Sequence, residues 1–140
     1  RDVYKRQVES IKSVGLIDSK NKLINELSGG QLQRVFIAKA FAQDPEIILL
    51  DEPTNHLDLK YQIEILEYLN LWAKENNKIV IAVLHDLNLS NLFGEKIILL
   101  SDGEIVSQGT PKEVFLEDNL KNVYNIDVKN FMISALKQWQ

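Results

Sequence analysis

Two short segments constrain this chain more than any other feature. Leu27-Ser28-Gly29-Gly30-Gln31 places a serine and two glycines where an amphipathic helix is expected to begin. Asp51-Glu52-Pro53 places two adjacent carboxylates directly after the apolar run Ile47–Leu50, which is typical of a buried strand. Helix starts bind anions, and residues just past parallel strands face the crevice where ligands bind. The sequence therefore predicts phosphate recognition combined with metal-assisted hydrolysis.

Composition narrows the class of protein. The 140 residues, 45% hydrophobic and 26% charged, fit at most one globular domain. A net charge of −4 without a long basic block argues against nucleic acid as a partner. The absence of cysteine excludes a disulfide framework and a thiolate metal site, and fits a cytosolic protein. The longest apolar runs, 79–84 and 97–100, are far shorter than the roughly 20 residues of a membrane span.

Hydrophobic periodicity predicts an α/β fold. Helices are expected over 8–16, 29–43, 59–73 and 87–93, with a further helix starting at Thr110-Pro111. Strands are expected over 47–50, 78–84, 96–100 and 104–107, the last two joined by an Asp-Gly turn. The first two strands lack alternation, so we expect both faces to be buried and the strands to form a parallel βαβ unit. The inner stripe of the helix over 59–73 is predicted to be Leu59, Ile63, Leu66, Leu69 and Ala73. Trp72 and Trp139 are interpreted as packing residues.

The motifs, taken in order, resemble those of one family. LSGGQLQR at 27–34, IILLDE at 47–52, NHLD at 55–58 and LHDLN at 84–88 are similar to the signature, Walker B, D-loop and switch-histidine motifs of ATP-binding-cassette (ABC) ATPases. The resemblance covers residues 8 to about 128. It implies a P-loop NTPase-like parallel sheet with flanking helices.

The resemblance also implies a division of the chain. No G-x-x-x-x-G-K-[ST] phosphate loop occurs, and the family's adenine-stacking aromatic and glutamine loop are missing as well. We therefore interpret the chain as the C-terminal part of one ABC ATPase domain, inactive alone, with an exposed apolar patch where upstream strands would pack. Residues 8–43 would end the helical subdomain, 44–128 belong to the catalytic core, and 129–140 form a C-terminal extension. Residues 1–7 fit nothing in the pattern and are interpreted as a non-native tail, the alternative being a native charged turn.

The resemblance implies specific roles for the residues that match the family's motifs, with ATP and Mg²⁺ as cofactors. Asp51 would hold Mg²⁺ through water, Glu52 would polarise the attacking water, and His85 would contact the γ-phosphate. Leu27, Ser28, Gly29, Gly30 and Gln31 would contact a nucleotide held by the partner subunit. Asp58, in the D-loop, would lie near the subunit boundary.

Each of these roles competes with a simpler structural interpretation. Asp58 could serve only as a helix cap, and Ser28 only as a plain N-cap. The carboxylates at 51–52 could form a solvated acidic turn. The second histidine, His56, is expected to have a structural role.

The segment 85–115 resembles the ATPases that import iron–siderophore complexes, haem or cobalamin. This predicts a second ATPase subunit in a homodimer, membrane permease subunits and, indirectly, a substrate-binding protein, at the cytoplasmic face of the membrane. Soluble translation factors of the same superfamily share DEPTNHLDL and are the alternative, together with a non-catalytic interaction fragment. The residues after the histidine, Asp86-Leu87-Asn88, and the Gly-Thr-Pro segment at 109–111 favour the importer.

Overall fold

The computed structural model describes residues 2–55 and 57–139 and shows two compact units, one ending at His85 and the other beginning at Asp86. The first contains α1 (Asp2–Ser13), two 3₁₀ turns (Ile17–Ser19 and Ile24–Glu26), α2 (Gly29–Ala42), β1 (Ile47–Asp51), α3 (Leu59–Asn76) and β2 (Ile79–Val83). The second contains α4 (Leu87–Phe93), β3 (Ile97–Ser101), β4 (Glu104–Gly109), α5 (Pro111–Val114), α6 (Glu117–Tyr124) and α7 (Val128–Lys137).

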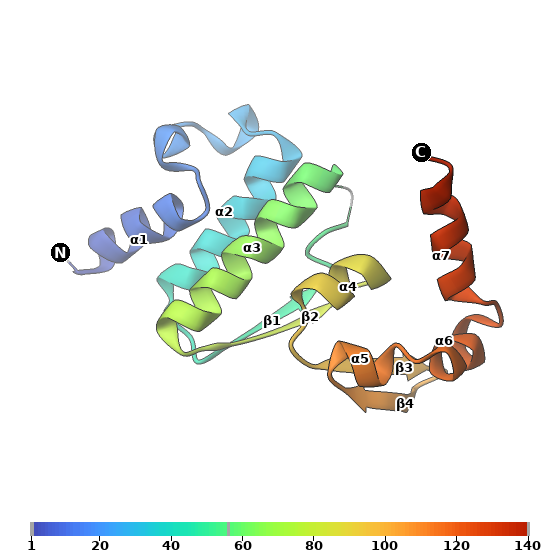
Figure 1. The fold of residues 1–140 in the computed structure, drawn as a ribbon. Helices are drawn as coiled ribbons and strands as arrows, with labels where there is room; N and C mark the ends of the chain where they lie inside the picture. The colour runs from blue at the N-terminus through green and yellow to red at the C-terminus, as the bar shows by residue number, and fades with distance from the viewer. Residues whose placement is uncertain (1, 56, 140) are drawn as a thin grey trace. The chain divides into compact units, whose positions relative to one another are not determined.

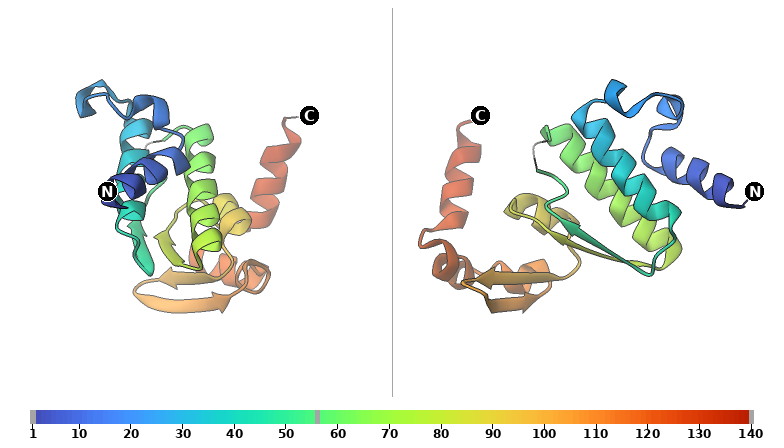
Figure 2. Two further views of the ribbon diagram at one scale, coloured as in Figure 1. Left: turned by 90° about the vertical axis from the view of Figure 1, so that its left-hand side faces the viewer. Right: turned by 180° about the vertical axis from the view of Figure 1, so that it is seen from behind.

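The first unit is built on a βαβ motif. β1 and β2 pair in parallel, with Ile47 opposite Ile79 and Asp51 opposite Val83, as the apolar runs predicted. α2 and α3 lie side by side and run in the same direction (Figures 1 and 2). They pack through a core that includes Ile37, Phe41, Ile65, Leu66, Leu69 and Trp72. The Trp72 ring stacks on Phe41 with centroids 4.7 Å apart, which confirms its packing role.

The two parallel strands are buried on one face and exposed on the other. Ile48 is only 5% exposed, whereas Leu49 is 73% exposed and Ile79, Ile81 and Val83 are each at least half exposed. The prediction of burial on both faces is therefore wrong for this chain. Burial depends on what covers a strand, and the helices of this unit lie on one side of the sheet (Figure 1). The expected exposed apolar patch is present.

Three further sequence predictions need correction. Leu66 and Leu69 of the predicted α3 stripe are buried as expected, whereas Leu59 is 64% exposed at the start of the helix. The other buried residues of α3 are Ile65 and Trp72, while Ile63 and Ala73 are half-buried. Trp139 is 89% exposed and so is not a packing residue here. The first helix, expected over 8–16, runs over Asp2–Ser13, so residues 2–7 form its first half. Their interpretation as part of a non-native tail stays a prediction, as do the other proposed domain boundaries.

The second unit begins with α4 and is organised around the β3–β4 hairpin. Its turn residues Asp102 and Gly103 both have positive φ, +52° and +81°, which the predicted Asp-Gly turn requires. Thr110 precedes α5, where the sequence predicted a helix start, and its N–H donates to Glu113 Oε2 at 2.7 Å. This bond is the main reason that the pKa of Glu113 is lowered. Within residues 2–55 and 57–139, none of the helices has the length and apolar character of a membrane span.

Candidate functional site

The carboxyl edge of the parallel pair brings three predicted residues together. Asp51 is the last residue of β1, and Glu52 follows it in a turn with φ of +48°. β2 ends opposite Asp51, so His85, two residues past Val83, reaches the same edge. His85 Nε2 contacts Glu52 Oε1 directly. The predicted sharing of one sheet edge is confirmed, whereas the chemical roles of these residues are not tested by this geometry.

The Glu52 carboxylate is held on both of its oxygens. Asn55 Nδ2 donates to Oε2, while His85 contacts Oε1. The backbone N–H of Asn55 also donates to the Glu52 carbonyl oxygen at 3.1 Å, which closes the turn. Sequence reasoning did not single out Asn55 as a site residue, because only the folded turn brings its amide to the Glu52 carboxylate. A carboxylate fixed in this way is oriented to accept a proton from a bound water.

Asp51 offers an exposed carboxylate beside Glu52 at the strand end. Within residues 2–55 and 57–139, no group of three or more His, Asp or Glu side chains is arranged to hold a metal ion. This donor set does not fit an ion coordinated by protein alone. It does fit Mg²⁺, which typically binds one or two carboxylates and takes its other ligands from water and substrate phosphates.

The start of α2 forms a second group. Ser28 Oγ accepts the Gln31 N–H at 3.3 Å, and Gln31 Oε1 accepts the Ser28 N–H at 3.0 Å, so Ser28 is the predicted N-cap and Gln31 completes a capping box. Gly29 is surrounded by open space, whereas a Cβ on Gly30 would lie 3.2 Å from the Tyr61 ring. The N–H groups of the first helical turn have no acceptor within the helix. Ser28 therefore caps α2 while the N–H groups of Gly29 and Gly30 stay available to an anion.

The two groups do not share a polar contact in the described part of the chain. Among the described residues, no hydrogen bond or ion pair joins the segment from Leu27 to Gln31 to Glu52 or His85. Asp58 occupies the N-cap position of α3 without a side-chain cap bond and is exposed, so its alternative role as a side-chain cap is not supported. His56, for which sequence reasoning favoured a structural role, lies outside the described residues.

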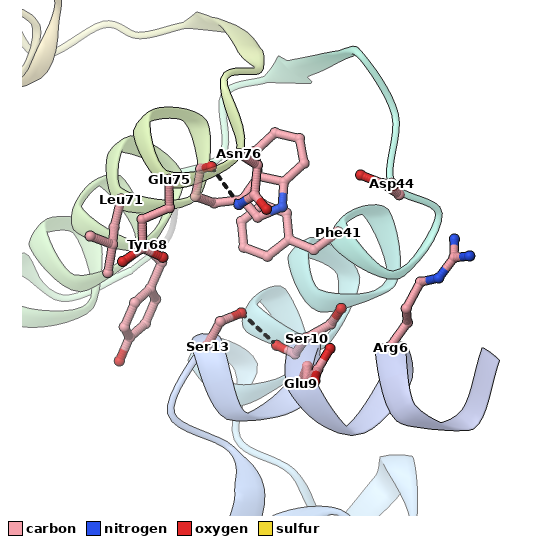
Figure 3. A pocket seen from close by; sticks show the side chains of 11 residues that line it. Arg6, Glu9, Ser10, Ser13, Phe41, Asp44, Tyr68, Leu71, Glu75 and Asn76 are labelled. Atoms are coloured by element: carbon pink, nitrogen blue, oxygen red, sulfur yellow. Dashed lines mark hydrogen bonds between the residues drawn. The ribbon is translucent and has the colours of Figure 1, made fainter. Parts of the chain in front are cut away.

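Figure 3 shows the lining of one cavity, which has a volume of about 270 Å³. It opens between α1, α2 and α3, and its lining includes Ser10, Phe41, Tyr68 and Asn76. Asn76 Nδ2 donates to the Trp72 carbonyl at 2.8 Å on its wall. None of the predicted site residues lines it, so this cavity is not part of the candidate site.

Comparison with known proteins identifies similar ABC transporter proteins at the level of both sequence and structure. The model of the ABC transporter family matches residues 3–55. The iron(3+)-hydroxamate import ATP-binding protein of Bacillus subtilis is 42% identical over 120 residues, which are 86% of this chain and 45% of that protein. The sequence thus matches a little less than half of that relative.

Solved structures of ABC proteins share the fold. A transporter described as of the metal-chelate type, in an inward-facing conformation, superposes with a TM-score of 0.82 at 29% identity over 89% of this chain and 50% of its own. A dimeric ATP-binding cassette in a post-hydrolysis state with ADP and Pi superposes with a TM-score of 0.66 at 44% identity over 76% and 46%. The predicted α/β fold of P-loop NTPase type is confirmed, and the chain spans about half the length of the relatives it matches. The chain belongs to the ABC transporter family of ATP-binding proteins.

Proposed function

We propose that this chain is part of the ATP-hydrolysing subunit of an ABC importer. The observation that carries the proposal is the contact between Glu52 and His85 at the carboxyl edge of β1 and β2. There, Glu52 takes the proton of the attacking water, and His85 holds the carboxylate and contacts the terminal phosphate. Asp51 binds Mg²⁺, which supplies charge neutralisation on the phosphates when bound.

The residues at the start of α2 serve a nucleotide bound mainly by a second subunit. Ser28, Gly29 and Gly30 present hydroxyl and N–H groups at a helix start, while Leu27 and Gln31 flank them. The lack of a hydrogen bond or ion pair between this group and Glu52 among the described residues fits a site shared between two subunits, and the related cassette with ADP and Pi is a dimer. Asp58, at the start of α3, lies near that subunit boundary.

The transported cargo is a metal chelate, carried through membrane permease subunits that receive it from a substrate-binding protein. Support comes from the similarity to an iron-hydroxamate import ATPase and to a metal-chelate type transporter, which also favours the importer over the translation-factor alternative. The subunit is held at the cytoplasmic face of the membrane by the permease, and no nucleic acid takes part. Since the 140 residues contain no phosphate loop, the isolated chain is expected to bind MgATP weakly and not to hydrolyse it.

The test uses the intact gene product. Glu52→Gln should slow ATP hydrolysis by about 10²–10⁴-fold while leaving ATP binding in place, because the amide keeps the shape and loses the basicity. Glu67→Gln, an exposed change on α3, is the matched control and should keep wild-type hydrolysis. Unimpaired hydrolysis by the Glu52→Gln protein would contradict the proposal.

A mixed dimer tests the shared site. One chain carries Ser28→Arg and the other carries Glu52→Gln. If Ser28 acts in the partner's site, both changes fall in one composite site and the other site stays whole, so about half of the hydrolysis should remain if the sites turn over independently. Loss equal to that of a dimer carrying Glu52→Gln in both chains would argue against the cross-subunit role.

A further inference from the structure

Two glutamine amides hold the turn that follows Glu52. Gln33 Nε2, on α2, donates to the Pro53 carbonyl at 3.3 Å. Gln62 Nε2, on α3, donates to the Thr54 carbonyl at 3.1 Å. Both turn residues are buried, Pro53 completely and Thr54 at 5% exposure. Since buried carbonyl oxygens need donors, these two amides satisfy groups that water does not readily reach.

The turn determines where the Glu52 carboxylate points. Pro53 follows Glu52 directly, and the Asn55 N–H closes the turn onto the Glu52 carbonyl. Glu52 itself has a positive φ, which a residue with a side chain rarely adopts unless its surroundings impose it. The two amides come from different helices, so the turn is fixed from two sides. Its geometry therefore depends on both helices, α2 and α3.

The helices that carry the two glutamines are themselves tied together near this point. The Tyr61 ring, one residue before Gln62, packs closely over Gly30 on α2. Arg34, one residue after Gln33, forms an ion pair with Glu64 on α3 at 3.4 Å. The two amide donors are consequently held at a fixed separation, and so are the two carbonyl oxygens that they bind.

We propose that Gln33 and Gln62 are positioning residues for the hydrolytic carboxylate. They fix the carbonyl groups of Pro53 and Thr54, and through this turn they hold Glu52 against His85. The effect on hydrolysis rests on the proposed function, because it assumes that Glu52 accepts the proton of the attacking water. The fixing of the turn itself does not depend on that assumption.

The kinetic experiment uses Gln33→Met and Gln62→Met in the intact gene product. Methionine keeps an unbranched side chain of similar length and removes the amide donor. The expected result is a fall in kcat on the order of tenfold with an unchanged KM for ATP, since small displacements of a reacting group lower the rate more than they lower binding. Gln43→Met is the matched control, because Gln43 is exposed at the C-cap of the same helix; it should keep wild-type kcat.

Amide hydrogen exchange provides a second readout that does not depend on activity. The Asn55 N–H donates to Glu52 within the turn, so its exchange should accelerate by roughly 3- to 10-fold in either glutamine variant and stay unchanged in Gln43→Met. A merely structural role would instead lower the thermal midpoint and spread faster exchange over both helices. If Gln33→Met does not fold, both measurements are made on Gln62→Met, because the two donors lie on separate helices.

The results separate this inference from the proposed function. Wild-type kcat and wild-type Asn55 exchange in both glutamine variants would overturn the positioning role. A general loss of stability without selective exchange at Asn55 would overturn it as well. Normal hydrolysis by Glu52→Gln would refute the proposed function, yet the exchange of Asn55 would still decide whether the glutamines hold the turn.

Discussion

Replacing Arg34 by methionine should destabilise the protein by about 1–3 kcal/mol, less than the roughly 3–5 kcal/mol for breaking a fully buried charge pair, because the Glu64 side chain is 26% exposed. The Arg34 side chain is 10% exposed, and its Nη1 lies 3.4 Å from both Glu64 Oε2 and the Val14 carbonyl. Its guanidinium also lies over the Tyr61 ring, 5.4 Å from the centroid. Arg34 on α2 therefore connects the segment just after α1, at Val14, with α3.

The size of this loss in stability follows from opposing contributions of charge attraction, ring contact and desolvation. A charge pair at about 4 Å contributes about 1 kcal/mol in water and about 4 kcal/mol at the effective dielectric of a partly buried site. The contact with the ring adds roughly 0.5–1 kcal/mol. Desolvation opposes both, and Arg34 Nε is buried without a hydrogen-bond partner among the described residues. Methionine retains the apolar stem, so packing loss is small and the electrostatic terms dominate.

The assay is a double-mutant cycle in urea with Arg34→Met, Glu64→Gln and the combined variant. We expect a coupling free energy of about 1 kcal/mol. Lys60 provides the control, because it pairs with the same carboxylate at 3.9 Å but its side chain is 75% exposed. Its coupling to Glu64 should stay below about 0.5 kcal/mol. A coupling for Arg34 no larger than that for Lys60 would refute the reasoning.

Three other changes test the packing and the titration of the chain. Gly30→Ala should place a Cβ 3.2 Å from the Tyr61 ring and destabilise the protein, and a second change of Tyr61 to leucine should restore part of the loss in thermal midpoint. Trp72→Ala should cost about 3–5 kcal/mol in urea unfolding, because the ring is 8% exposed and stacked on Phe41. Hydrogen bonds from the backbone and side chain of Asn130 lower the pKa of Asp127 below its ordinary 3.8. The ionised Asp127 carboxylate therefore stabilises the folded protein above that pH, and this contribution is lost as the pH falls through the lowered pKa. Asp127→Asn should accordingly make the urea midpoint fall less steeply between roughly pH 5 and 2.

The parts of the fold that the sequence predicted well are those where local signals agree. The runs before Asp51 and before His85 are apolar and β-branched, and the segment between them has a helical period, so β1, α3 and β2 were predictable. Ser28 and Thr110 precede helices at the positions expected for helix caps, and both helix starts were placed correctly. These elements were recognisable because helix caps, hydrophobic periodicity and helix-ending residues such as proline all indicated the same boundaries.

Other features depend on tertiary neighbours that no local pattern specifies. Whether Leu49 is buried is decided by what lies over its face of the sheet, and its residue type says nothing about that. The helical region after residue 116 was not predicted, because its polar residues mask the apolar period, although Asp127 does cap α7 through Asn130. Likewise, Gln33 and Gln62 are ordinary helix residues until the turn at Pro53 is brought between them.

The separation of the two groups of candidate residues bears directly on how a nucleotide could be used. Glu52 and His85 are in contact at the sheet edge, while Ser28 and Gly29 belong to a helix start that, within the described residues, makes no polar contact with them. The Glu52 turn is bonded to α2 through Gln33, five residues beyond Ser28. Under the proposed function, a nucleotide meets the helix start and the carboxylate on two different subunits, which the mixed dimer tests. The Gln33 bond thus gives this chain a short physical connection between the start of α2 and the turn that carries Glu52.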